Sequence, residues 1–97
     1  MATHIKRHGG IGPKGDQRIT SLAAATALTV PAGANMAVLQ AETQNIRVVF
    51  DGSTPTTTKG LLLKTTDEPL IFEGDLSQIK VIEVTASAAL NVTYLAS

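Results

Sequence analysis

The chain has 97 residues, a length that suits a single small domain. Hydrophobic residues make up 43% of it and charged residues only 16%, a composition that argues against wholesale disorder. The sequence contains no cysteine, which excludes disulfides, thiolate zinc sites and a cysteine nucleophile, and its apolar runs are too short to cross a bilayer.

The formal net charge is zero, but the charges are distributed unevenly. Residues 1–18 hold four basic residues and one acidic residue, for a charge of +3, and residues 19–97 carry −3. We therefore divide the chain into a basic arm, residues 1–18, and a mildly acidic body, residues 19–97. Glycines stand where a signal peptide would have its apolar region, so we expect synthesis in the cytoplasm.

The arm contains four glycines and one proline, and alone in water such a segment is disordered. We expect it to be extended and to dock on a neighbouring molecule, and its removal to leave the body folded. The alternative is that it packs back onto its own body. The expected interface residues are Ile5, Lys6, Arg7, Ile11, Lys14 and Arg18.

From residue 19 onward the pattern predicts short β-strands separated by turns. Apolar residues alternate with polar ones around residues 46–50 and 90–94, as in a strand with one buried face. Residues 79–84 are apolar on both faces, which predicts a strand in the middle of a sandwich. Glycine, proline, asparagine and aspartate mark the turns between segments. About seven strands are expected from eight candidate segments: 19–22, 27–30, 35–42, 45–50, 60–64, 69–73, 78–85 and 89–95.

One stretch, residues 21–28, offers a helical alternative because Ser21 can cap a run of alanines. The run spans about two turns, lacks Glu or Gln at the third position after Ser21, and leads directly into Thr29, Val30 and Pro31. We favour extended structure there. The expected fold class is all-β, a small antiparallel β-sandwich or jelly roll with an extended N-terminal arm.

Few residues offer catalytic or metal chemistry. His4 and His8 have the spacing of a metal pair on a helix, but glycines follow them and no further ligand lies nearby in the sequence. The acidic pairs at residues 67–68 and 73–75 lie in turns, where carboxylates are usually solvated. We expect no enzymatic activity, no catalytic residue, no cofactor and no metal.

Two binding functions deserve comparison with a structural one. The basic arm suits phosphate contacts, but the aromatic residues Phe50, Phe72 and Tyr94 alternate as core residues rather than forming a stacking platform. We therefore expect no nucleic-acid partner. A small carbohydrate-binding β module remains an alternative, although the chain has no tryptophan for sugar stacking.

Four segments together resemble small virion proteins of tailed bacteriophages, in particular head decoration, or cementing, proteins. The resemblance covers residues 28–96, is one of overall texture rather than of a catalytic signature, and does not include the arm. The segments are residues 28–42, 45–52, 73–82 and 90–96.

The resemblance implies a non-enzymatic protein on the capsid surface of a virion, which bridges neighbouring shell subunits. Its implied partners are the major capsid protein and further copies of itself, as a homotrimer or homodimer, with no nucleic acid and no membrane. A position in the neck, tail or fibres is the alternative within the same class.

Overall fold

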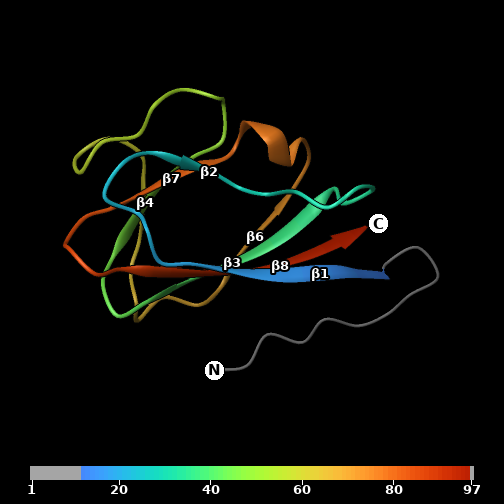
Figure 1. The fold of residues 1–97 in the computed structure, drawn as a ribbon, viewed down its shortest axis with the longest axis horizontal. Helices are drawn as coiled ribbons and strands as arrows, with labels where there is room; N and C mark the ends of the chain where they lie inside the picture. Colours follow the sequence, from blue (N-terminus) through green and yellow to red (C-terminus); the bar gives the residue numbers. More distant parts are fainter. Residues whose placement is uncertain (1–11, 97) are drawn as a thin grey trace.

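The computed structural model describes residues 12–96, and in this part of the chain regular structure is almost entirely β (Figure 1). A single-turn 3₁₀ helix, η1 (Leu76–Gln78), lies between the sixth and seventh strands. The strands are β1 (Gly12–Ile19), β2 (Thr26–Ala27), β3 (Met36–Glu42), β4 (Ile46–Val49), β5 (Leu61–Leu63), β6 (Leu70–Glu73), β7 (Lys80–Glu83) and β8 (Ala89–Ala96).

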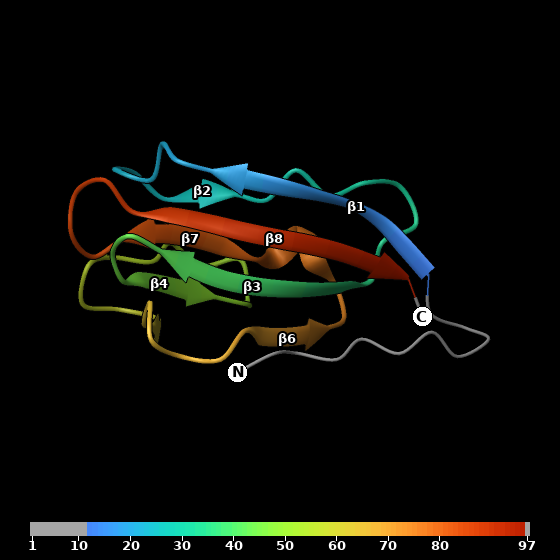
Figure 2. The same ribbon diagram turned by 90° about the horizontal axis from the view of Figure 1, so that it is seen from below.

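The strands form two antiparallel four-stranded sheets, which lie over one another (Figure 2). Sheet A has the order β1-β8-β3-β6, and sheet B has the order β2-β7-β4-β5. The pairings β1·β8, β2·β7, β3·β6 and β4·β5 are nested, so the chain resembles one long hairpin folded over on itself. The pairings β3·β8 and β4·β7 then join these pairs into the two four-stranded sheets. The expected all-β class with antiparallel sheets is thus confirmed.

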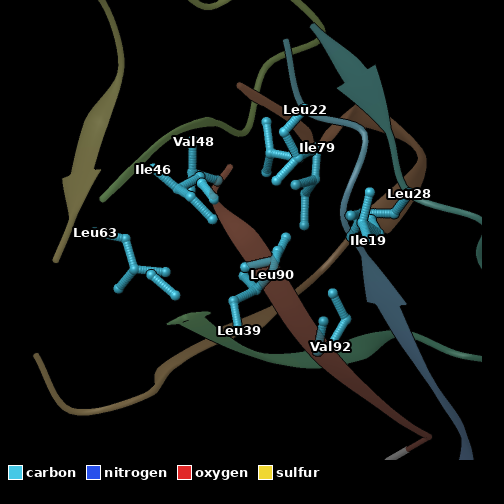
Figure 3. Close-up of a cluster of buried hydrophobic side chains, with 14 of the residues drawn as sticks. Ile19, Leu22, Leu28, Leu39, Ile46, Val48, Leu63, Ile79, Leu90 and Val92 are labelled. Atoms are coloured by element: carbon cyan, nitrogen blue, oxygen red, sulfur yellow. The ribbon is translucent and has the colours of Figure 1, made fainter. Parts of the chain in front are cut away.

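Both sheets contribute side chains to one hydrophobic core (Figure 3). The predicted alternation is clear in β8, where Leu90, Val92 and Tyr94 are buried and Thr93 is exposed. The core cluster contains Ile19, Leu22, Leu28, Ala37, Leu39, Ala41, Ile46, Val48, Leu63, Leu76, Ile79, Val81, Ala88, Leu90, Val92 and Tyr94.

Three further predictions about the body hold. The strand expected to be apolar on both faces is β7, which lies between β2 and β4 and buries Val81 completely. Residues 21–28 contain no helix, and their regular structure is the short strand β2. The aromatic residues also face inward: Tyr94 is 1% exposed, and Phe50 and Phe72 pack against the core with ring centroids 4.7 Å apart.

The first predicted segment, residues 19–22, is wrong. The strand instead spans Gly12–Ile19, so residues 12–18 of the expected arm pair with β8 as an edge strand of sheet A. Only Ile19 gives this strand a buried apolar side chain, which is why hydrophobic periodicity does not reveal it. Residues 1–11, the rest of the expected arm, lie outside the described residues.

A β-bulge lies within β1, where the register shifts between Pro13 and Gly15. Gly15 has φ +122°, a conformation that glycine adopts without the steric cost of a side chain. The glycine and proline content that suggested a free arm therefore belongs, in part, to an irregular edge strand.

Truncation should separate β1 from the residues that precede it. A chain beginning at residue 19 lacks β1 and leaves the β8 edge unpaired, whereas a chain beginning at residue 12 keeps the strand. We expect the shorter chain to lose at least about 2 kcal/mol of unfolding free energy relative to the longer one, because several ladder hydrogen bonds disappear. Urea denaturation of both chains measures the difference, and equal midpoints would contradict the assignment of β1.

Candidate interaction surface

The outer face of sheet A presents a polar surface where β1 and β8 meet. Asp16 and Arg18 of β1 lie in register with Thr93 and Asn91 of β8, respectively. These residues, together with Gln17 and Val92, line a shallow hollow of about 310 Å³. The strand register sets this polar row, since alternate side chains of each strand point to the same face.

Arg18 is anchored to its own body across β8. Its Nη2 lies 2.9 Å from Oε1 of Glu42 on β3, and its Nε donates to the same oxygen at 3.0 Å. Hydrogen bonds from Arg18 and then from Asn91 hold the pKa of Glu42 below its usual value. Both charged side chains are about half exposed, at 54% and 45%, so the pair orients Arg18 more than it stabilises the fold.

The six expected interface residues divide into two groups. Lys14 and Arg18 lie in β1 and are exposed, with Lys14 Cε close to Gly33 in the loop between β2 and β3. The structure therefore brings both basic side chains onto one edge strand of the body. The other four, Ile5, Lys6, Arg7 and Ile11, lie outside the described residues.

Gln17, which the sequence analysis did not single out, ties β1 to the core. Its Oε1 accepts a hydrogen bond of 2.5 Å from the Tyr94 hydroxyl and one of 3.2 Å from the Thr29 backbone N–H. Burial raises the pKa of Tyr94 to about 12. The signal available in the sequence was the spacing of two: Gln17 lies two positions before the core residue Ile19, so in an extended strand both side chains point to the same face.

The acidic residues of the body mainly organise turns. Asp51 Oδ1 accepts from the backbone N–H and hydroxyl of Ser53, at 3.0 and 2.6 Å. Asp75 makes the same pair of bonds to Ser77 and caps η1. These bonds lower the pKa of both carboxyl groups. Asp67 likewise accepts from the backbone N–H of Lys64.

A second hollow, of about 340 Å³, lies beside the start of β5. Arg47 of β4 holds the loop between β4 and β5 in place by donating to the carbonyl oxygens of Thr57 at 3.2 Å and Gly60 at 3.1 Å. The lining of this hollow is largely apolar and consists of Val48, Val49, Phe50, Asp51, Ser53, Lys59, Gly60 and Leu61.

Within residues 12–96, no group of three or more His, Cys, Asp or Glu side chains is placed to hold a metal ion. No helix in the described part of the chain is long and apolar enough to span a membrane.

Family models, curated proteins and solved structures give no match to this chain.

The Tyr94 hydroxyl can be titrated directly, because Tyr94 is the only tyrosine and there is no tryptophan. We expect an ultraviolet absorbance midpoint near pH 12 instead of the ordinary 10.0. The unfolded chain ionises first, so the free energy of unfolding should decline as pH rises from 10.0 to about 12. Tyr94→Phe is the blank, and a native-state midpoint near 10 would contradict the buried environment.

The Arg18–Glu42 pair makes a second prediction. In Arg18→Ala, the pKa of Glu42 should rise towards its ordinary 4.5, because the largest interaction favouring the carboxylate is gone. Carboxyl NMR titration measures this shift. The pKa of Asp51, which depends on Ser53, is the internal control and should not move. An unchanged Glu42 titration would show that the pair does not form in solution.

Proposed function

We propose that this chain is a non-enzymatic virion structural protein of a tailed bacteriophage. In this proposal it decorates and cements the capsid shell by bridging neighbouring major capsid subunits, and its N-terminal segment docks on a neighbour. The observation that carries the proposal is the nested arrangement of the eight strands, considered with the resemblance of residues 28–96 to small virion proteins.

The strand orders support a finer description of the body as a jelly-roll β-sandwich. A jelly roll arises when a long hairpin rolls up, so that strands 1 to 4 pair with strands 8 to 5, and the four nested pairings follow this rule. Jelly rolls recur in viral capsid domains and also in lectins and cupins. The architecture alone therefore does not select the virion, and the sequence resemblance supplies that step.

The N-terminal segment enters the body through β1, at the edge of sheet A. Lys14 and Arg18 of β1 are exposed, and Arg18 lines the polar hollow. Residues 1–11, which precede β1 in the sequence, carry Lys6 and Arg7. These basic groups suit carboxylates on a shell subunit, and an extended segment can add backbone hydrogen bonds. Because Arg18 already pairs with Glu42, its guanidinium group has a fixed orientation on the surface that we propose as the contact.

A cementing role needs no chemistry beyond binding. A protein that binds only the assembled shell stabilises that state by mass action. Repeated sites on the shell reinforce the effect, since a subunit held at one contact has a high effective concentration at the next. A rigid two-sheet body with a basic segment at one edge suits this mechanism.

The deciding measurement is the number of copies per purified phage particle, by quantitative mass spectrometry against the major shell protein. Hundreds of copies, in a simple ratio to the shell protein, are expected for a head decoration protein. A few to about a dozen copies would place the chain in the neck, tail or fibres, where symmetry is low. Its absence from particles would overturn the virion assignment.

Truncation tests the docking segment separately. A chain beginning at residue 12 keeps β1 and should bind shells at least about tenfold more weakly than the full chain. The matched control is Thr85→Glu, an exposed position in the loop between β7 and β8, which should leave shell binding unchanged. Equal shell occupancy by the full and truncated chains would contradict a role for residues 1–11.

A further inference from the structure

The two sides of the molecule differ in how their strand edges are protected. On one side, β1 carries Pro13, the bulge at Gly15 and the charged residues Lys14, Asp16 and Arg18, and β2 is only two residues long. Proline, bulges, charges and shortness are the features that prevent edge-to-edge pairing of sheets. This side is therefore built to remain unpaired with other sheets.

The opposite side lacks most of these features. In the described part of the chain, β5 pairs only with β4 and β6 pairs only with β3, so each is the edge strand of its sheet. β5 is short but consists of three leucines, and β6 contains no proline, glycine or lysine. Leu61 of β5 and Ile71 of β6, at 49% and 52%, are the exposed large hydrophobic side chains among residues 12–96.

Both free edges lie on the same side of the molecule. In Figure 2, β1 lies beside β2, β8 beside β7 and β3 beside β4, so the last strands of the two sheets, β6 and β5, come at the same end. The stacking of Phe50, which follows β4, on Phe72 of β6 confirms this alignment. The hollow lined by Val49, Phe50 and Leu61 adds apolar surface beside the β5 edge.

The charges that flank these two strands are opposite. Lys59 precedes β5 by two residues and Lys64 follows it directly. Glu68 precedes β6 by two residues and Glu73 ends it. We propose that this side is a self-association surface, on which β5 of one copy meets β6 of a second copy and the lysines face the glutamates.

The charge pattern selects this pairing over the alternatives. β5 against β5 brings lysines together, and β6 against β6 brings glutamates together, and like charges at such positions are destabilising. β5 against β6 places a lysine next to a glutamate at each end, whichever way the strands run. A two-fold axis that lies in the interface, parallel to the strands and midway between the two sheets, exchanges the two sheets, so both β5–β6 contacts form in one closed dimer.

The dimer does not depend on shell binding, so its test is separate from that of the proposed function. Sedimentation of the full chain from about 1 μM to about 1 mM should reveal a reversible dimer. Leu61→Lys and Ile71→Lys alter exposed side chains, and each should weaken dimerisation at least about tenfold. Circular dichroism verifies that these variants fold.

Charge reversal gives the sharper test. Lys59→Glu/Lys64→Glu places acidic residues beside both β5 and β6, and Glu68→Lys/Glu73→Lys makes both edges basic. Each variant alone should dimerise at least about tenfold more weakly than the natural chain. An equimolar mixture should recover the dimer as a heterodimer, because every β5–β6 contact then pairs opposite charges.

The matched control is Thr20→Glu/Ala27→Glu, which adds two acidic residues on the protected side and should leave dimerisation unchanged. A full chain that stays monomeric throughout the range overturns the proposal and leaves the edge to a different partner. The proposal is also overturned if the mixture fails to dimerise, or if the control variant weakens dimerisation as much as the β5 and β6 variants do.

Discussion

The pairing of β1 with β8 is the constraint on which the rest of the described structure depends. It joins residues 12–19 to the other end of the body and places β8 between two neighbours in sheet A. Ile19 is the buried apolar residue of β1, so the partly buried hydrogen bond from the Tyr94 hydroxyl to Gln17 gains importance for holding this strand. A buried hydroxyl left without this acceptor would be costly, which makes the position of β1 specific. The pairings β2·β7, β3·β6 and β4·β5 are nested inside this one.

This constraint also decides how the basic N-terminal region relates to the body. The segment that precedes β1 in the sequence joins the body at the edge of sheet A, and β1 itself carries Lys14 and Arg18. Arg18 is held by Glu42, so its charge has a defined position on the polar face. Basic side chains that are already ordered in β1 lose less entropy on docking than the same side chains on a free chain would. The body thus contributes the ordered part of the interface that we propose.

The sequence predicted the body well because its core strands alternate apolar and polar residues. Leu90, Val92 and Tyr94 show the period of a half-buried strand, and all three are buried. It failed at β1, where glycines and charges hide a strand that is held by a glutamine and by a partner about 75 residues away. The same limit applies to the surface, because the Arg18–Glu42 pair and the neighbouring free edges depend on strand order. Strand order is a long-range property that local patterning does not encode.

A domain of this size buries a modest core, and it gains more from partners than a large domain does. The two sides of the body differ in the kind of contact that they can offer to a partner. The β1 side replaces apolar surface with charges, a bulge and a polar anchor, so association there must use polar contacts. The β5 and β6 side leaves leucine and isoleucine side chains exposed on two edge strands, which are flanked by opposite charges. Polar docking on one side and strand association on the other are mutually compatible, because neither surface overlaps the other. The shell binding and the self-association that we propose therefore use separate surfaces of the body.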